Sequence, residues 1–363
     1  MLPKHAARWI TLGTVAALVA ACQDATPPVA PTAAAPSFEV SGEGQDRLAR
    51  WFARAYPEVL ALPGTVFADH DEVGGRLVFG VENASAAGSV ESALSRLGIP
   101  GSAYRIEVTE PIRPAVTLRD RFRPTQAGIQ IHFSLFVCTL GFNVSHSGGR
   151  SFITNSHCTD HQGGTEGTEY AQPLRSVDPT VIATEAADPE YFTWRENAAC
   201  PVGRRCRYSD ASRARYSDAV GSSQGLIART TGPNNGSITV DGANPFFEIT
   251  SQDNSTTSFK IGTVVNKVGR TTGWTQGEIV ASCVHTNVFG SNFTQLCQTF
   301  VSNPNARIVA GGDSGSPVFE TSGRDRAKLI GILWGGSGTS LFVFSPLKQI
   351  RDELGAFTAT ATN

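Results

Sequence analysis

The sequence has little net charge, few charged runs and no long apolar stretch. Its 363 residues include 30 Lys and Arg against 32 Asp and Glu, which gives a formal net charge of −2. Such a close balance argues against nucleic acid as the main partner. Charged runs that favour helices are scarce, so a mainly helical protein is not expected. The length exceeds that of one typical domain, and we expect two folded units.

The apolar stretch nearest the N-terminus indicates export rather than a membrane span. A basic start is followed by apolar residues 10–21, which are too few to cross a bilayer and are typical of a signal peptide. Residues 19–22 read Val-Ala-Ala-Cys and resemble the bacterial lipobox, in which the cysteine is lipidated. We therefore expect a signal peptide with lipobox over 1–22 and lipidation at Cys22. An ordinary signal peptide with an incidental cysteine is the alternative.

The cysteine count fits an exported protein. There are seven cysteines, an odd number, and assigning Cys22 to a lipid leaves six. Pairing these in sequence order closes three short loops, Cys138–Cys158, Cys200–Cys206 and Cys283–Cys297. The sequence alone does not fix one connectivity among the possible ones. An oxidising compartment suits such a chain, so we expect a cell-envelope lipoprotein or a secreted protein. The histidines are scattered and the cysteines look paired, so neither a metal nor a cofactor is expected.

Composition changes along the chain predict its organisation. Residues 23–44 are rich in Ala, Pro, Thr and Ser and predict a flexible tether. Residues 45–120 mix helical and strand patterns, predict a small α+β domain and show no paired catalytic groups. Residues 121–127 are basic and contain proline, as expected of a linker. Over 128–363, strand patterns separated by glycine-rich turns predict a mainly β domain.

Residues 311–317 read Gly-Gly-Asp-Ser-Gly-Ser-Pro and place Ser314 in a turn with glycine on both sides. Small neighbours keep the hydroxyl accessible and let backbone N–H groups converge beside it. This arrangement suits acyl transfer, which needs a nucleophile and donors for the developing negative charge. A turn of this composition is usually only a turn, so the interpretation depends on a histidine and a carboxylate elsewhere.

His157 is the histidine with the most suitable setting. It ends the strand-like run 151–158 beside Cys158, and a Cys138–Cys158 bridge would hold it on a rigid element. A structural histidine is the plainer interpretation of this residue taken alone. Two aspartates, Asp210 and Asp218, compete for the carboxylate, because each lies in a Tyr-Ser-Asp-Ala segment.

These motifs resemble the chymotrypsin-like serine peptidase family, most closely its bacterial streptogrisin and α-lytic-type branch. The resemblance is carried by Thr-Asn-Ser-His-Cys at 154–158, with Asn155 where alanine is usual, and by Gly-Asp-Ser-Gly-Ser-Pro at 312–317. It implies a double six-stranded antiparallel β-barrel over 128–363 and the chain order His, Asp, Ser. In this branch Arg-Tyr follows the catalytic aspartate by five and six positions, which favours Asp210 over Asp218.

The resemblance implies roles for these residues. Ser314 attacks the carbonyl carbon, His157 accepts and returns the proton, and Asp210 orients the imidazole. The backbone N–H groups of Gly312 and Ser314 form the oxyanion hole. Asp313 is expected to pair with Arg270, which lies in a Gly-Arg-Thr-Thr-Gly segment as in the bacterial branch.

The resemblance also implies where a substrate binds. Trp334 and Gly335 correspond to a strand that binds substrate backbone, with Leu333 in place of the usual serine. Ile308 and Val309 are expected to line the base of the primary pocket. Because these two residues are apolar, we expect a preference for apolar side chains before the scissile bond, rather than for Arg or Lys.

The leading hypothesis is therefore a secreted or surface-anchored serine endopeptidase that acts on a polypeptide through an acyl-enzyme. By the same resemblance, residues 45–120 are similar to a pro-region that inhibits the enzyme until it is removed. The membrane would be contacted only through the lipid anchor. The alternatives are a catalytically silent protease-fold binding or adhesion protein, and an esterase or self-processing hydrolase.

Overall fold

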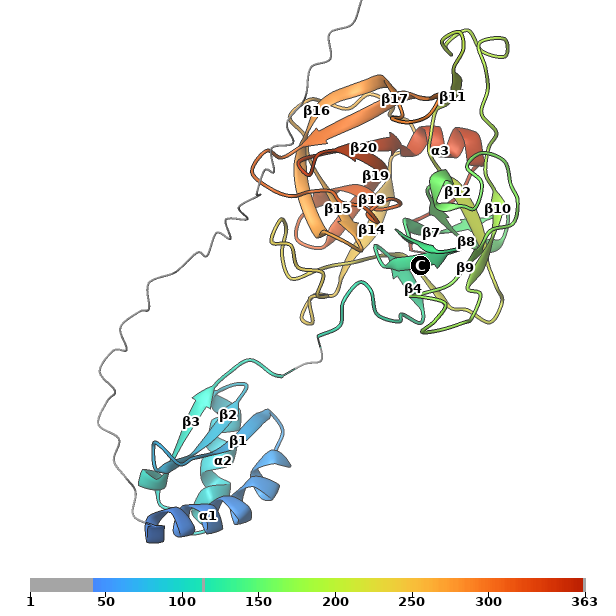
Figure 1. Cartoon of the computed structure of the whole chain (residues 1–363). Coiled ribbons are helices and arrows are strands. Elements are labelled where there is room, and N and C mark those ends of the chain that lie inside the picture. Colours follow the sequence, from blue (N-terminus) through green and yellow to red (C-terminus); the bar gives the residue numbers. More distant parts are fainter. Residues whose placement is uncertain (1–41, 113–114, 362–363) are drawn as a thin grey trace, which may run out of the picture. The chain divides into compact units, whose positions relative to one another are not determined.

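The computed structural model describes residues 42–112 and 115–361 (Figure 1). The expected signal peptide, Cys22 and nearly all of the expected tether lie outside these residues. The chain divides into two compact units, Met1–Ile112 and Arg113–Asn363. Within the described ranges, no helix combines the length and the apolar character needed to cross a membrane.

The first unit combines two helices with a small sheet. Its elements are α1 (Gly42–Leu60), β1 (Thr65–Asp71), β2 (Arg76–Val81), α2 (Ala84–Arg96), the short 3₁₀ helix η1 (Gly101–Ala103) and β3 (Tyr104–Val108). The strands lie in the order β1-β2-β3, with β2 antiparallel to β1 and parallel to β3. Asn83 caps α2, because its side chain accepts the N–H of Ala86 at 3.0 Å. Leu77, Phe79 and Leu94 are fully buried in the core of this unit.

The second unit is built almost entirely from strands, which confirms the predicted mainly β class. They are β4 (Thr125–Ala127), β5 (Gln130–Phe133), β6 (Phe136–Thr139), β7 (Phe142–His146), β8 (Gly149–Thr154), β9 (Glu169–Tyr170), β10 (Ala183–Ala187), β11 (Arg205–Arg207), β12 (Ser212–Tyr216), β13 (Ser222–Ala228), β14 (Phe246–Gln252), β15 (Val264–Gly269), β16 (Gly273–Asn287), β17 (Phe293–Ser302), β18 (Pro317–Ser322), β19 (Arg326–Ser337) and β20 (Leu341–Pro346). The 3₁₀ helix η2 (Ser156–Cys158) follows β8, and α3 (Leu347–Leu354) follows β20.

Strands β15 to β20 close into a ring. Antiparallel pairing runs from β15 to β16, β17, β20, β19 and β18, and β18 pairs again with β15. The interior is apolar, with Val265, Ile279, Val301 and Phe344 fully buried. Each strand of the ring pairs with a neighbour on both sides over part of its length, so this half is a rigid base for the loops that leave it.

In the first half of the second unit, the strand pairings do not trace a continuous ring of six strands, so this detail of the predicted barrel is not confirmed. Its pairings form a sheet in the order β7-β8-β12-β10-β9 and a separate β5-β6 hairpin, joined by a bridge between His132 and Ala171. At the β7 edge, the Asn143 amide donates to the carbonyls of Thr125 (2.9 Å) and Ser223 (3.0 Å). The Asn143 side chain therefore links β7 to the backbone of β4 and of β13.

The boundary between the units lies earlier than the sequence predicts. Leu118 is fully buried in the main core of the second unit, and its N–H donates to the carbonyl of Ile238 at 2.9 Å. Strand β4 pairs in parallel with β13. The segment 121–127, predicted to be a linker, is thus part of the second unit, because its Thr125–Ala127 strand supplies buried residues to the sheet.

Replacing Leu118 with alanine tests this boundary. We expect Leu118→Ala to lower the free energy of unfolding of the second unit by about 2–5 kcal/mol, because it removes fully buried methyl groups. Ile112→Ala, at a side chain that is 79% exposed, should change it little. Denaturant unfolding of the whole chain, followed by tryptophan fluorescence, compares the two. Equal midpoints for both variants would restore the predicted boundary at residue 120.

Candidate active site

Pairing of β8 with β12 brings His157 and Asp210 together. In this ladder Thr154 lies opposite Ser212, so η2 at the end of β8 lies beside the residues that precede β12. His157 Nδ1 and Asp210 Oδ2 are 2.5 Å apart, and the backbone N–H of His157 donates to Asp210 Oδ1 at 3.1 Å. Two contacts from one carboxylate fix both the backbone and the ring of the histidine.

The two groups shift each other's pKa in opposite directions. Burial lowers the pKa of His157, but the charge of Asp210 and its hydrogen bond outweigh this, so the pKa is raised above 6.5. Burial raises the pKa of Asp210, and the charges of His157 and Arg207 together with the hydrogen bond bring it below its usual value. The pair therefore favours an ionised aspartate and stabilises a protonated imidazole.

Asn155, the unusual residue before Ser156, supports the aspartate. Its amide donates to the backbone carbonyl of Asp210 at 2.7 Å, and the N–H of Ser156 is 3.4 Å from the same carbonyl. The competing Asp218 is exposed, and its carbonyl accepts a bond from Arg150 at 3.3 Å. The structure thus brings Asp210, and not Asp218, to His157.

Support for Asp210 also comes from the second half of the unit. The N–H of Asp210 donates to Ser345 Oγ at 3.1 Å, and Ser345 Oγ donates to Gln298 Oε1 at 2.9 Å. Trp334 Nε1 donates to the same Gln298 oxygen at 2.8 Å. Leu333, which stands where serine is usual, is buried in the core instead. Ser345 and Gln298 were not predicted from the sequence, because no local motif marks them.

The turn that carries Ser314 is docked on Thr139 at the end of β6. The N–H of Thr139 donates to the carbonyl of Ser314 at 2.8 Å, and its hydroxyl donates to the carbonyl of Gly312 at 2.9 Å. Gly312 and Gly315 have φ of +91° and +93°, and a Cβ on Gly315 would lie 2.1 Å from the carbonyl oxygen of Thr139. Glycine is therefore required at 315 for both conformation and space.

The expected oxyanion donors are available within this turn. Neither the N–H of Gly312 nor that of Ser314 donates a hydrogen bond to another residue of the described ranges. Ser314 and His157 both line a cavity of about 270 Å³, whose other walls are Phe133, Phe136, Val137, Cys138 and Thr159. No hydrogen bond joins the Ser314 hydroxyl to the imidazole among the described residues, and unliganded sites often show such a gap.

The three disulfides join the cysteines in sequence order, as the simplest pairing predicts: Cys138–Cys158, Cys200–Cys206 and Cys283–Cys297. The first links β6, which docks the serine turn, to η2, which carries His157. Cys138, Cys158 and His157 also form the one cluster of potential metal ligands among the described residues. Because both sulfurs are in the disulfide, this cluster offers no thiolate to a metal.

The predicted pairing of Asp313 with Arg270 is corrected by the structure. Asp313 instead lies 3.3 Å from Lys267 Nζ, and both side chains are completely buried. Arg270 turns away, because its Nε donates to Gln130 Oε1 at 2.6 Å. The segment around Arg270 still contacts Asp313, since the N–H groups of Thr271 and Thr272 donate to its Oδ1 at 3.0 and 3.1 Å.

Lys267 is the residue that the motif comparison missed. It lies in β15, whose sequence Val-Val-Asn-Lys-Val-Gly is otherwise mostly apolar. A lysine inside a buried strand is a signal in itself, because an unpaired ammonium group is costly to bury. Burial lowers the pKa of Lys267, against the opposing effect of Asp313. The pair anchors the serine turn to β15.

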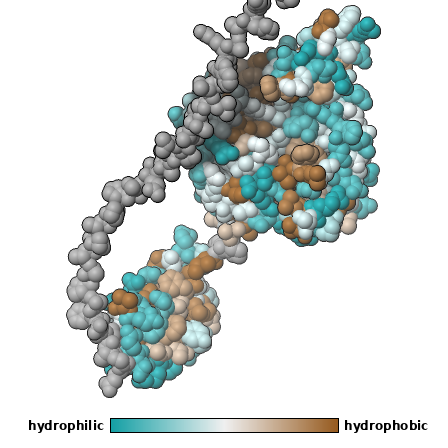
Figure 2. All heavy atoms as spheres, viewed as in Figure 1, coloured by the Kyte–Doolittle hydropathy of each residue, from teal (hydrophilic) through white to brown (hydrophobic). Residues whose placement is uncertain are grey.

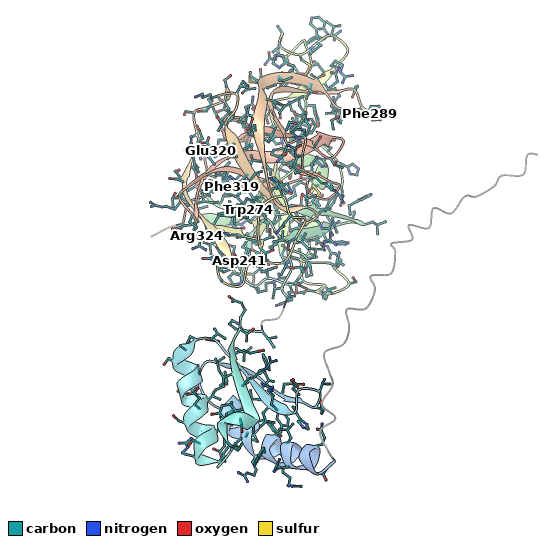
Figure 3. All side chains as sticks on the ribbon, turned by 90° about the vertical axis from the view of Figure 1, so that its left-hand side faces the viewer. Asp241, Trp274, Phe289, Phe319, Glu320 and Arg324 are labelled. Atoms are coloured by element: carbon teal, nitrogen blue, oxygen red, sulfur yellow. A yellow bond between two sulfur atoms is a disulfide. The ribbon has the colours of Figure 1, made fainter. Side chains whose placement is uncertain are left out.

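A second cavity adjoins the same histidine and has a volume of about 500 Å³. Besides His157, Asp210 and glycines 335 and 336, its lining has six apolar and four polar side chains: Val288, Phe289, Phe300, Trp334, Leu341 and Val343, and Gln162, Thr286, Asn287 and Ser337. Phe289, between β16 and β17, is fully exposed and projects outward in Figure 3. Hydrophobic surface gathers in separate patches on the face of the second unit that Figure 2 shows.

Two of the predicted substrate-binding residues line this second cavity and two do not. Trp334 and Gly335 are in its wall. Ile308 and Val309, predicted at the base of the primary pocket, are buried in the core of the β15–β20 ring instead. The N–H groups of both residues donate to the carbonyl of Thr339, at 2.7 and 3.2 Å, and Val309 lies against Gly336 of the cavity wall.

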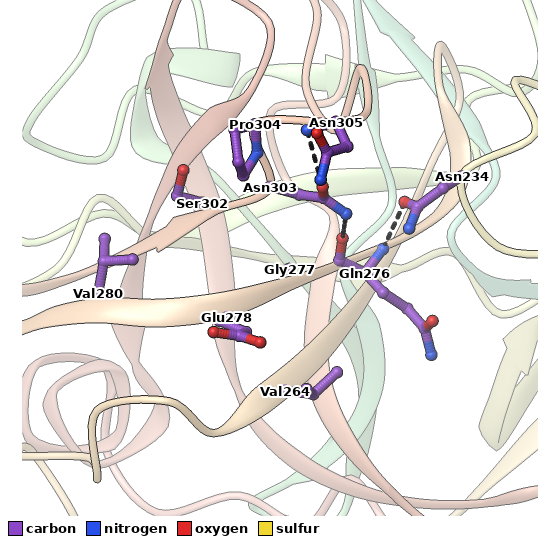
Figure 4. A pocket seen from close by; sticks show the side chains of 10 residues that line it. All are labelled: Asn234, Val264, Gln276, Gly277, Glu278, Val280, Ser302, Asn303, Pro304 and Asn305. Carbon is purple, nitrogen blue, oxygen red and sulfur yellow. Dashed lines mark hydrogen bonds between the residues drawn. The ribbon is translucent and has the colours of Figure 1, made fainter.

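A third cavity, of about 570 Å³, is separate from the candidate triad (Figure 4). Side-chain amides gather there, and several are already bonded: Asn234 Oδ1 accepts the N–H of Gln276 at 2.8 Å, and Asn303 Nδ2 donates to the carbonyl of Gln276 at 3.0 Å. Glu278 is the only ionisable side chain in its lining. Ser302 lies opposite Glu278 on the neighbouring strand, but its hydroxyl donates to the carbonyl of Ser340 at 3.3 Å, and no histidine is in the lining of this cavity.

Comparison with known proteins gives one family match and several similar structures. The model for the family described as Nal1 C-terminal domain matches residues 235–345, less than half of the chain. That stretch includes Ser314 but neither His157 nor Asp210.

Similar solved structures include three bacterial proteases. Thermobifida fusca Protease A is 22% identical, with 65% of this chain and 98% of that chain covered and a TM-score of 0.45. Cellulomonas bogoriensis chymotrypsin is 21% identical, with 65% and 98% covered and a TM-score of 0.42. Nocardiopsis protease is 19% identical, with 62% and 94% covered and a TM-score of 0.42. All three are of the class that the sequence motifs resemble.

Matched substitutions at Lys267 and Arg270 test the corrected ion pair. We expect Lys267→Met to cost about 3–5 kcal/mol in the free energy of unfolding, because it leaves the Asp313 carboxylate buried without its cation. Arg270→Met should cost clearly less, since Arg270 makes no salt bridge to Asp313 in the structure. Chemical denaturation measures the free energy of unfolding of both variants. A larger loss for Arg270→Met than for Lys267→Met would restore Arg270 as the partner of Asp313.

Proposed function

We propose that the chain is a serine endopeptidase that hydrolyses peptide bonds through Ser314, His157 and Asp210. The observation that carries the proposal is the 2.5 Å contact of His157 Nδ1 with a buried aspartate, next to a cavity that His157 shares with Ser314. A histidine oriented in this way on one side and open to a serine on the other suits general-base catalysis.

The proposed mechanism assigns one task to each group. His157 Nε2 removes the proton from Ser314 as the hydroxyl attacks the carbonyl carbon, and the imidazolium then gives the proton to the departing amine. Asp210 holds Nδ1 and stabilises the imidazolium charge. The N–H groups of Gly312 and Ser314 receive the oxyanion, and each such donor contributes about 3 kcal/mol to transition-state stabilisation in comparable sites. Water then releases the acyl group by the reverse sequence.

A polypeptide substrate fits the edge of β19. Up to Ile332 this strand pairs with β18, but from Leu333 to Ser337 its strand partner is β20 alone. The opposite edge at Trp334 and Gly335 can therefore accept an extended substrate by strand addition. The adjoining wall includes the large apolar side chains of Phe300 and Trp334, which supports a preference for apolar side chains before the scissile bond. A silent binding protein would not need the two unoccupied N–H donors beside Ser314.

We also propose that the protein acts outside the cytoplasm. Three disulfides suit an oxidising compartment. Lipidation at Cys22 and inhibition by the unit before residue 113 belong to this proposal.

Labelling with a fluorophosphonate probe tests the nucleophile. We expect the protein to be labelled at Ser314, and Ser314→Ala to lose the label completely, because the probe reacts with an activated serine hydroxyl. Ser316→Ala is a matched control in the same turn, since Ser316 is buried and donates to the carbonyl of Asp313. Equal labelling of wild type and Ser314→Ala would contradict the proposal.

A peptide-library digest of the labelling-competent protein then separates the substrate classes. Cleavage after apolar residues supports an endopeptidase with the proposed preference. Cleavage only after Arg or Lys refutes the proposed preference. Hydrolysis of ester substrates with no hydrolysis of peptides refutes the proposal of an endopeptidase.

The pH dependence of labelling tests the His157–Asp210 couple. Protonated His157 cannot accept the serine proton, so the rate should fall as the pH decreases, with a midpoint above 6.5 because the pKa of His157 is raised. Asp210→Asn removes the cause of the increase, and burial alone should move the midpoint below 6.5. The rate should also decrease roughly 10⁴-fold, as it does when the carboxylate of such a triad is neutralised. An unchanged midpoint in Asp210→Asn would contradict the coupling.

A further inference from the structure

A buried ion pair lies directly behind the His157–Asp210 couple. Arg207 Nη1 and Asp188 Oδ1 are 2.7 Å apart, and both side chains are completely buried. Arg207 ends β11 and Asp188 follows β10, so the pair joins two parts of the chain that carry no triad residue. Neither residue belongs to a motif, and nothing along the chain indicates that the two meet.

The Arg207 guanidinium contacts both segments that carry the couple. Its Nη1 donates to Ser156 Oγ at 2.8 Å, and Ser156 directly precedes His157. Its Nη2 donates to the carbonyl of Ala211 at 2.8 Å, and Ala211 directly follows Asp210. The planar guanidinium holds its donors at fixed angles, so these two contacts set the distance between the segments.

Asp188 completes the arrangement from the other side. Ser156 Oγ donates to Asp188 Oδ2 at 2.7 Å, and the N–H of Gly163 donates to the same oxygen at 3.1 Å. Arg207 also lies over the ring of Tyr191, 5.4 Å from its centre. The Ser156 hydroxyl is therefore hydrogen-bonded to both charged groups. Because Ser156 directly precedes His157, these bonds also restrain the backbone of His157.

Stability alone is a weak reason for such a pair. A buried ion pair often contributes no more to folding than apolar residues of similar volume would, because desolvation offsets the attraction. A pair that contacts residues on both sides of the couple fits a geometric role better. The positive charge of Arg207 also helps to keep the pKa of Asp210 low.

We propose that Arg207, fixed by Asp188, is a positioning residue that holds His157 and Asp210 in register for proton transfer. The proposal rests on the proposed function of Ser314, His157 and Asp210. The other polar groups near the couple do not bridge the segment of His157 and the segment of Asp210 as Arg207 does. Gln162 Nε2 is 3.4 Å from Asp210 Oδ1, and Glu353 accepts the N–H groups of Tyr208 and Ser209 at 2.9 Å each. The charged or titratable groups that act on the couple or on Arg207 are Asp188, Tyr191 and Glu353.

The double variant Arg207→Met/Asp188→Asn tests the proposal while keeping the net charge. It removes both charges together, so no uncompensated charge stays buried. We expect kcat on a peptide substrate to fall roughly 10-fold to 100-fold with KM nearly unchanged, because a small misplacement of the couple affects proton transfer more than binding. The midpoint of the acid limb should move toward that of an ordinary histidine, since a looser contact with Asp210 raises the pKa of His157 less.

Ser156→Ala is the milder second variant. It removes the hydroxyl between the ion pair and His157 but leaves the 2.7 Å contact of Arg207 with Asp188 in place. We expect a smaller loss of kcat and a shift of the midpoint in the same direction. This variant keeps the proposal falsifiable if the double variant does not fold.

Arg229→Met/Asp325→Asn is the matched control. Arg229 and Asp325 form an ion pair that contacts neither His157 nor Asp210, and Arg229 lies over the rings of Phe247 and Trp274. We expect this variant to keep the wild-type kcat and midpoint. A folded Arg207→Met/Asp188→Asn protein and a folded Ser156→Ala protein that both behave like the control would overturn the proposal.

An NMR titration of the His157 ring in the Ser314→Ala background separates this proposal from the proposed function, because it requires no turnover. If wild type shows no Ser314-dependent labelling, the proposed function fails. A His157 midpoint that still falls in the Arg207→Met/Asp188→Asn variant would then support the positioning role, and an unchanged midpoint would refute it.

Discussion

The contact of Thr139 with the serine turn is the constraint on which the candidate site depends. The residues that hold the imidazole and the residues that present the nucleophile come from different halves of the second unit. Thr139 donates through its N–H and its hydroxyl to the carbonyls of Ser314 and Gly312, and Gly315 fits against its own carbonyl. Since the neighbouring Cys138 is bonded to Cys158, this one position also connects the turn to His157.

Two completely buried ion pairs fix the geometry of the site. Lys267 and Asp313 anchor the serine turn to β15, and Arg207 and Asp188 lie behind the His157–Asp210 couple. In both pairs each carboxylate also accepts backbone N–H groups, which offsets the cost of removing it from water. A charge held by several directed bonds restricts movement more than apolar packing does, and acyl transfer tolerates little movement.

Some groups of the candidate site are needed for acyl transfer itself, and others support those groups or select the substrate. The oriented histidine and the two N–H donors belong to the chemistry of acyl transfer itself. Asn155, Ser156 and Ser345 each support the couple through a bond that the motifs do not imply. The apolar wall near Trp334 and Phe300 bears on which peptide is bound rather than on whether one is cleaved.

The sequence by itself determined what is local. It placed His157 at the end of a strand beside Cys158, Ser314 between glycines, and Asp210 ahead of Arg215 and Tyr216, because neighbouring residues share one turn or one strand. Only the tertiary structure decided which distant groups meet. It selected Lys267 over Arg270 for Asp313, turned Ile308 and Val309 into the core, moved the unit boundary ahead of Leu118, and joined Arg207 to Asp188. These outcomes depend on strand register and on the reach of each side chain, and neither can be read from spacing along the chain.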